Sequence, residues 1–129
     1  MKTDLDEAQR TGVSLTQTEQ TVLQQAAFAL AQCRYYLGDY HEAVALYHRL
    51  ANENMGKVEG LLALQQLWAC YYAQPDRGQA AATLTRMRLF LEAVDDKLFA
   101  NRPDSQSKKA IQTWIEKSEQ ETQKLSVVP

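Results

Sequence analysis

The sequence predicts an all-α fold of antiparallel helical hairpins, and three observations support this class. Glycine (5) and proline (3) are scarce among 129 residues, whereas alanine, leucine and glutamine, which favour helices, are abundant. Apolar residues recur at steps of three and four along most of the chain. Short connections with capping residues separate the periodic segments, which is typical of antiparallel neighbours. We expect helices at 15–37, 40–54, 57–73, 77–99 and 105–125.

The first expected helix begins in the stretch SLTQTEQ, which contains two overlapping capping boxes. One pairs Ser14 with Gln17, and the other pairs Thr16 with Glu19. Gly38 suits the left-handed turn that follows the end of this helix. The apolar residues at helical spacing are Val22, Ala26, Ala29, Leu30 and Cys33.

The next three helices differ in how much of their surface is apolar. The second and fourth begin at capping pairs, Asp39 with Glu42 and Asp76 with Gln79. The third is apolar on most sides, which indicates a helix sandwiched between others. The fourth is expected to continue to the break at Pro103. Its apolar stripe consists of Ala80, Leu84, Met87, Leu91, Val94 and Leu98.

The fifth helix carries Ile111, Trp114 and Ile115 on one side, and lysine, glutamine and glutamate on the other. This pattern predicts a capping helix with one covered face and one solvated face. The chain then divides into a flexible N-terminal segment, one helical domain and a short tail. Their ranges are 1–13, 14–125 (hairpin 14–56, hairpin 57–100, capping helix 105–125) and 126–129.

Two units of the sequence coincide when the chain is shifted by 37 residues. The matching pairs are Cys33/Cys70, Tyr35/Tyr72, Asp39/Asp76 and Ala43/Ala80. Each unit is two helices joined by a short capped turn, which is the form of a helical-hairpin solenoid. The small residue at Ala43 and Ala80 lets the two helices of a hairpin approach closely.

The first unit, 24–55, resembles a tetratricopeptide repeat (TPR). The residues that carry the resemblance are Leu30-Ala31, Gly38-Asp39-Tyr40, Ala43 and Tyr47. The second unit, 61–94, resembles the family with departures at Pro75 and Trp68, and Met55 replaces the usual terminal proline of the first. The resemblance implies a short TPR-like solenoid.

The family resemblance also implies a non-enzymatic protein–protein interaction or scaffold module, with a peptide or partner helix held on a concave face. That face would offer tyrosines and amides rather than charges. The expected groove residues are Gln25, Phe28, Gln32, Tyr35, Tyr36, Leu62, Gln65 and Tyr72. Phe28 and Gln32 stand where chaperone-tail binders carry clamp residues, so that ligand is disfavoured. An accessory or regulatory domain of a larger enzyme or assembly is the alternative, followed by an RNA-binding helical repeat.

The sequence shows no arrangement of residues that would make an enzyme, a metal site or a cofactor site. His41 and His48 are too far apart along a helix to share a metal ion. Cys33 and Cys70 are expected to be two buried thiols rather than a disulfide. No glycine-rich phosphate motif occurs. Arg86 and Arg88 are interpreted as solvated surface.

The formal net charge of −2 disfavours a nucleic-acid or anionic-membrane partner. No apolar run approaches the ~20 residues that a membrane-spanning helix needs, and the polar N-terminus lacks the core of a signal peptide. These features predict a cytoplasmic protein.

The first hairpin has no capping helix, unlike the second. We therefore expect its side that bears Val22, Ala29 and Tyr47 to be partly exposed. Two interpretations remain open. Either the chain self-associates there as a homodimer, or this side docks on another protein or on preceding repeats.

Overall fold

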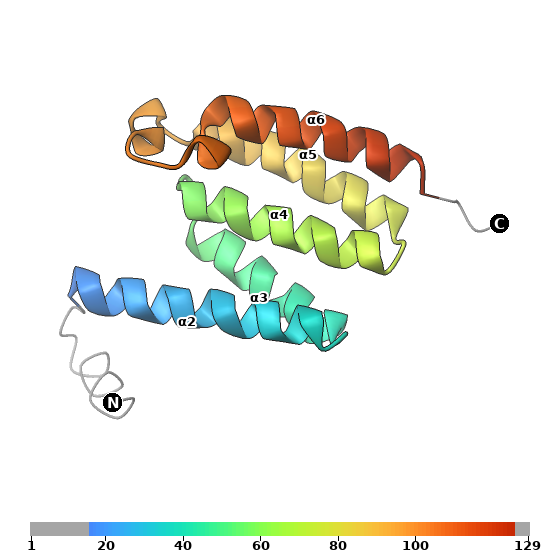
Figure 1. Cartoon of the computed structure of the whole chain (residues 1–129), viewed down its shortest axis with the longest axis horizontal. Helices are drawn as coiled ribbons and strands as arrows, with labels where there is room; N and C mark the ends of the chain where they lie inside the picture. The colour runs from blue at the N-terminus through green and yellow to red at the C-terminus, as the bar shows by residue number, and fades with distance from the viewer. Residues whose placement is uncertain (1–15, 126–129) are drawn as a thin grey trace.

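A computed structural model describes residues 16–125, which contain five α-helices, two short 3-10 helices and no strand (Figure 1). The all-α class is therefore confirmed. The helices lie across the molecule in chain order, with α2 at one end and α6 at the other. Their bounds are α2 Gln17–Tyr36, α3 Tyr40–Glu53, α4 Val58–Ala73, α5 Arg77–Ala93, η1 Asp96–Phe99, η2 Asp104–Gln106 and α6 Lys108–Gln123. No helix among these residues is long and apolar enough to cross a membrane.

Each helix packs chiefly on its neighbours in the sequence, so α2 contacts α3, α3 contacts α4, α4 contacts α5, and α5 contacts α6. The expected pairing of the first four helices as two hairpins is present. Helix α2 starts at the predicted capping box, where Thr16 and Glu19 exchange two 3.1 Å hydrogen bonds. Ser14 and the segments 1–13 and 126–129 lie outside the described residues.

The turns of the two hairpins share the same hydrogen bonds. The backbone N–H of Asp39 donates to the carbonyl of Arg34, and that of Asp76 donates to the carbonyl of Tyr71, both at 2.9 Å. Each aspartate side chain then caps the following helix by accepting an N–H bond three residues on. Gly38 has a φ of +78°, which glycine adopts without strain. Local chemistry therefore sets both reversals of the chain.

The core is centred on α4, which lies between α3 and α5. Its apolar residues Leu61, Leu64 and Leu67 are all fully buried. This helix can approach the end of α3 because position 60 is glycine. A Cβ atom there would lie 2.4 Å from the backbone oxygen of Asn54. The sandwiched position of α4 agrees with its predicted apolar surface.

Helix α5 ends earlier than the sequence predicts. The expected helix 77–99 stops at Ala93, because Val94 is extended with ψ 124°. The side chain of Asp95 accepts a 2.9 Å hydrogen bond from the N–H of Lys97 and so starts the 3-10 helix η1. Short acidic side chains compete with helical hydrogen bonds in this way. Leu98, the last member of the predicted stripe, is consequently 45% exposed.

Helix α6 covers the second hairpin with its apolar side. Ile111 and Ile115 are fully buried, and Trp114 is partly buried with its ring edge-on to Trp68 at 5.4 Å. The expected range 105–125 shortens to Lys108–Gln123, since the side chain of Ser107 caps the helix by accepting the N–H of Ala110.

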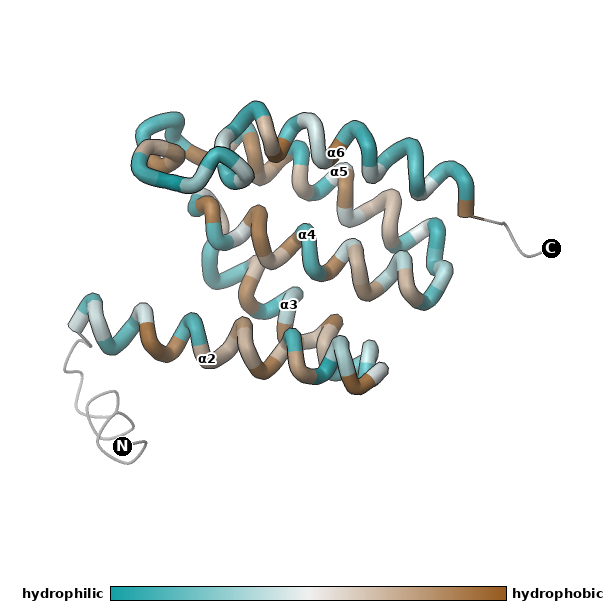
Figure 2. The backbone as a smooth tube through the Cα atoms, in the orientation of Figure 1, coloured by the Kyte–Doolittle hydropathy of each residue, from teal (hydrophilic) through white to brown (hydrophobic). Residues whose placement is uncertain are grey.

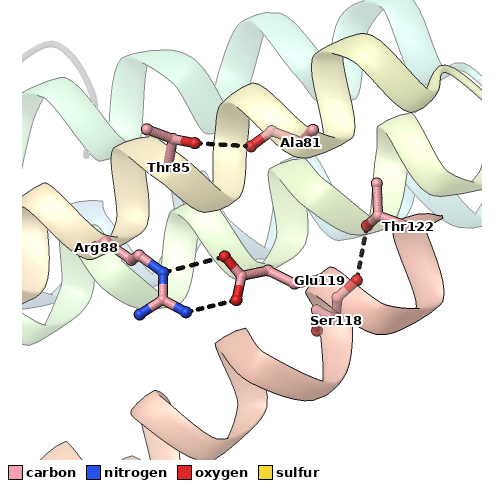
Figure 3. Close-up of polar contacts among 6 residues, drawn as sticks. All are labelled: Ala81, Thr85, Arg88, Ser118, Glu119 and Thr122. Atoms are coloured by element: carbon pink, nitrogen blue, oxygen red, sulfur yellow. Dashed lines mark hydrogen bonds and ion pairs between the residues drawn. The ribbon is translucent and has the colours of Figure 1, made fainter.

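Polar contacts also hold α6. In Figure 3, Arg88 of α5 donates two hydrogen bonds to the Glu119 carboxylate, at 3.0 and 2.5 Å. The indole N–H of Trp68 donates to the Thr122 hydroxyl at 2.9 Å, which ties α4 to α6 as well. Arg88 is exposed, as expected of solvated surface, and its ion pair with Glu119 also ties α5 to α6.

Helix α2 is the least buried of the five α-helices, since Ala31 is the one residue of its twenty that is fully buried. Two expectations for this region are wrong. Cys33 is exposed rather than buried, because it lies on the side of α2 turned away from α3. Tyr47 is 1% exposed rather than partly exposed, because it lies beneath α2 in contact with the ring of Phe28. Val22 is 57% exposed and Ala29 is exposed, as expected.

Candidate functional site

A concavity with a volume of about 550 Å³ lies between α2 and α4. Helices α2 and α4 supply its two walls, and α3 supplies one side chain between them. The volume lies within the range of small-ligand and peptide-anchor pockets. The lining residues are Thr21, Gln24, Gln25, Phe28, Ala29, Gln32, Tyr47, Glu59, Leu62, Gln65 and Gln66.

The apolar part of this α2–α4 cavity is formed by Phe28, Tyr47 and Leu62. Phe28 and Leu62 are partly buried and pack on the core, so they belong to both the fold and the cavity. The ring centroids of Phe28 and Tyr47 are 6.4 Å apart in a tilted pair. Burial raises the pKa of the Tyr47 phenol to about 12, so this hydroxyl stays neutral at physiological pH.

The polar part of the cavity is formed mainly by glutamine carboxamides. Each carboxamide offers an acceptor oxygen and two N–H donors. Among the described residues, no hydrogen bond engages the side chains of the five glutamines of the lining, so all five can bond to a ligand. They are Gln24, Gln25 and Gln32 on α2 and Gln65 and Gln66 on α4.

One charged side chain, Glu59, lines the cavity, and its charge is compensated within the structure. The Arg102 guanidinium donates a hydrogen bond to the Glu59 carboxylate. Both side chains are more than two-thirds buried, at 29% and 22% exposed. The cavity therefore presents apolar and amide groups with little net charge.

The structure brings together five of the eight groove residues that the sequence predicts. Those that line the cavity are Gln25, Phe28, Gln32, Leu62 and Gln65. The three tyrosines lie outside the lining. Tyr35 packs edge-on against Tyr36 and Tyr40, with centroids at 5.5 and 5.6 Å, and Tyr36 is 74% exposed at the end of α2. The ring of Tyr72 lies 4.8 Å from that of Trp68.

Sequence reasoning missed six lining residues, namely Thr21, Gln24, Ala29, Tyr47, Glu59 and Gln66. Gln24 precedes Phe28 by one helical turn, so the three- and four-residue spacing contains the signal for it. Tyr47 belongs to α3, and its role depends on how deeply α2 lies over that helix. No local pattern encodes that depth.

A second polar cluster joins α3, α4 and α5 through His48. The His48 ring bonds the Tyr71 hydroxyl through Nε2 and Arg86 through Nδ1, both at 3.1 Å. Arg86 also donates to Asn52 and lies over the ring of Phe90, so it is a structural residue rather than solvated surface.

The histidine of this cluster is held in its neutral form. Burial, with a smaller contribution from the Arg86 charge, lowers the pKa of His48. The guanidinium has only N–H donors, so His48 Nδ1 is the acceptor and Nε2 carries the proton. Within residues 16–125 no group of three or more metal-ligating side chains occurs.

Comparisons with known proteins found no matching family model, no similar curated protein and no similar solved structure.

Proposed function

We propose that this chain is a non-enzymatic protein–protein interaction module, built as a short stack of TPR-like hairpins with α6 as the cap. The proposal takes its support from the two hairpin turns, which make the same hydrogen bonds 37 residues apart. The small residues at Ala43 and Ala80 are both fully buried, as close packing within each hairpin requires. The unpaired thiols of Cys33 and Cys70 are consistent with a cytoplasmic protein, which is part of the proposal.

The observation that carries the proposal is the chemistry of the α2–α4 cavity. A ring of carboxamides around an apolar floor suits a polypeptide segment, because backbone amides present the same donors and acceptors that glutamine side chains match. The floor formed by Phe28 and Leu62 then takes an apolar side chain of the ligand. The bound ligand would be a peptide or a partner helix anchored by one such side chain.

The compensated charge of the cavity further specifies the ligand. Since Glu59 is paired with Arg102, the site offers no strong attraction to an acidic or a basic segment. The ligand would be an uncharged stretch, and its affinity would vary little with salt concentration. The same neutrality argues against RNA, whose binding needs a basic surface.

Selection from a phage-displayed library of random 12-residue peptides against the full chain tests this proposal. We expect enriched peptides that carry an aromatic or large aliphatic residue among uncharged ones. Synthetic versions should bind the parent chain, and the double variant Gln25→Glu/Gln65→Glu should bind them at least about tenfold more weakly, because two carboxylates replace amide donors and leave the peptide carbonyls unpaired.

The control for this variant is Gln112→Glu, which adds a carboxylate to the exposed side of α6, away from the cavity. It should bind as the parent does. Unaltered binding by the double variant would contradict the cavity as the binding site. Enrichment of strongly acidic or basic peptides would contradict the proposed ligand class.

A further inference from the structure

The side of α2 that is turned away from α3 is apolar along its length. A helix at the surface of a globular protein normally places polar residues there. Here that side, called the outer face of α2, consists of Val22, Ala26, Ala29 and Cys33, with Leu23 and Leu30 at its edge, where they line a concavity with Leu46 and Leu50 of α3. All six residues are exposed. Glutamine and threonine lie beside this face, towards the cavity.

Exposed apolar side chains are concentrated on this part of the molecule. Among the described residues, eight large apolar side chains are exposed, and five of them lie from Val22 to Leu37. The remaining three, Met55, Leu89 and Leu98, lie singly on other elements. A contiguous exposed apolar patch usually marks an interface, whereas single exposed apolar side chains are ordinary.

The equivalent positions of α4 show what such a face does when it is covered. Position 30 corresponds to Leu67 and position 33 to Cys70 by the 37-residue shift, and both are 0% exposed where α4 packs into the row. Ala63, which corresponds to Ala26, is also fully buried. At these three positions the outer face of α2 therefore resembles a buried helix-packing surface, whereas Ala29 corresponds to the exposed Gln66.

The chain itself presents one partner of matching chemistry, which is the same face on a second copy. The face of α3 that covers α4 is already occupied by α4 in every molecule. The exposed side of α6 is polar and carries lysine, glutamine and glutamate. Within residues 16–125, the outer face of α2 is the apolar helix surface that remains open in each copy.

The pattern of this face is complementary to itself when two copies run antiparallel. Its central residues follow steps of four, three and four, so a two-fold axis between Ala26 and Ala29 places Val22 against the partner's Cys33. The two alanines at the centre allow close approach of the helices. No charged residue occurs from Gln20 to Cys33, so no like charges meet along the seam.

The charges that bound this segment are also compatible with the antiparallel arrangement. Glu19 and Arg34 flank the uncharged stretch at opposite ends of α2. Antiparallel copies bring Glu19 of each helix towards Arg34 of the other. Arg34 also lies 3.8 Å from Asp39 of its own chain, so its charge is shared, and the preference for this orientation over a parallel one is modest.

We propose that two copies of this protein form a two-fold symmetric dimer through antiparallel packing of the outer faces of α2. Of the residues that line the α2–α4 cavity, Ala29 alone belongs to this face, so both sites can be occupied in the same molecule. The proposal stands independently of ligand binding in the cavity.

Sedimentation across a micromolar dilution series tests the dimer with the full chain itself. The parent should show a monomer–dimer equilibrium, and Ala26→Arg should weaken it at least about tenfold, because the two-fold axis brings two guanidinium groups together. Ala26 is exposed, so the circular dichroism of this variant should match that of the parent. A strictly monomeric parent would overturn the proposal and leave docking on another protein as the use of this face.

Disulfide trapping tests the geometry. In the Val22→Cys variant, mild oxidation should link position 22 of each copy to the partner's Cys33, since facing positions of closely packed helices come within disulfide reach. The control Gln112→Cys, on the exposed side of α6, should give no such cross-link. Dimers that resist Ala26→Arg, or that show no link between positions 22 and 33 in the Val22→Cys chain, would refute the α2 seam.

Discussion

Helices α2 and α6 occupy opposite ends of the same row, yet they end it differently (Figure 2). Most charged and amide side chains of α6 are exposed, while Ile111 and Ile115 are fully buried and Ser118 and Thr122 are buried beside them. Helix α2 has apolar residues on both sides, with Ala31 buried beneath it and Leu30 47% exposed beside it. In Figure 2, α2 is brown or tan over much of its length, whereas α6 is largely teal.

The difference shows that a helix at the end of the stack can pack on its neighbour without giving the stack a polar outer surface. Helix α6 does both, because its covered face is apolar and its other face is solvated. Helix α2 packs on α3 but leaves an apolar surface in water, which costs free energy unless something covers it. The α6 end therefore presents a mostly polar surface to water, whereas the α2 end presents an apolar one.

Truncation of one aliphatic side chain at each end gives the largest expected contrast. Ile115→Ala should lower the free energy of unfolding by about 3 kcal/mol, since it opens a cavity beneath α6. Leu30→Ala should change it by about 0.5 kcal/mol or less in the monomer, because that side chain is 47% exposed. Urea unfolding at the lowest usable protein concentration measures both. Equal losses would remove the distinction between the two ends.

The hydrogen bond between α4 and α6 gives the next largest effect. Trp68→Phe removes the indole N–H that the buried Thr122 hydroxyl accepts and should cost about 1–2 kcal/mol. A double-mutant cycle with Thr122→Val isolates the pair and should give a coupling energy of about 1 kcal/mol. A coupling energy near zero would mean that this bond does not fasten α6.

The sequence predicted the α6 end well and the α2 end less well. Polar and apolar residues segregate cleanly in the last helix, so its cap-like packing and the burial of Ile115 follow from periodicity. In the first helix apolar residues lie on both sides, and periodicity does not say which side faces α3. The expected burial of Cys33 was wrong for that reason.

The sequence patterns also did not predict the early end of α5 or the burial of Tyr47. The apolar stripe ran through Val94 to Leu98, and it concealed the competing side-chain bond of Asp95. The burial of Tyr47 depends on the position of α2 over α3, which is a tertiary property. Five of the eight expected groove residues line the cavity because Phe28 and Leu62 follow the helical spacing, whereas the tyrosines pack at the helix ends.

The ion pair between α5 and α6 should contribute less than the Trp68 bond. Glu119→Gln should lower stability by about 0.5 kcal/mol, because both side chains are more than a third exposed. The loss should shrink in high salt, which screens exposed charges. Glu92→Gln is the control, since residues 16–125 show no ion pair for Glu92. A loss independent of salt would point to a packing role for Glu119.

The smallest expected effect concerns pH and the contacts that join the first hairpin to the rest of the row. His48 of α3 bonds Tyr71 of α4 and Arg86 of α5, so it links the α2 end to the α6 end. Its pKa in the folded protein lies below the ordinary value, mainly through burial, so the unfolded chain binds a proton more readily. The stability from this neutral histidine is present above the unfolded pKa of about 6.5 and is lost as the pH falls through the folded value.

Hydrogen exchange and urea unfolding between pH 7 and pH 5 measure this loss. As the pH falls, the amides of α2 and α3 should lose protection before those of α6, because protonation places a second cation beside Arg86 at the junction of the hairpins. His48→Gln should remove this part of the pH dependence, whereas His41→Gln, which removes an exposed histidine, should retain it. If α6 loses protection together with α2 and α3, the two ends unfold as one cooperative unit, and the contrast between them is confined to their surfaces.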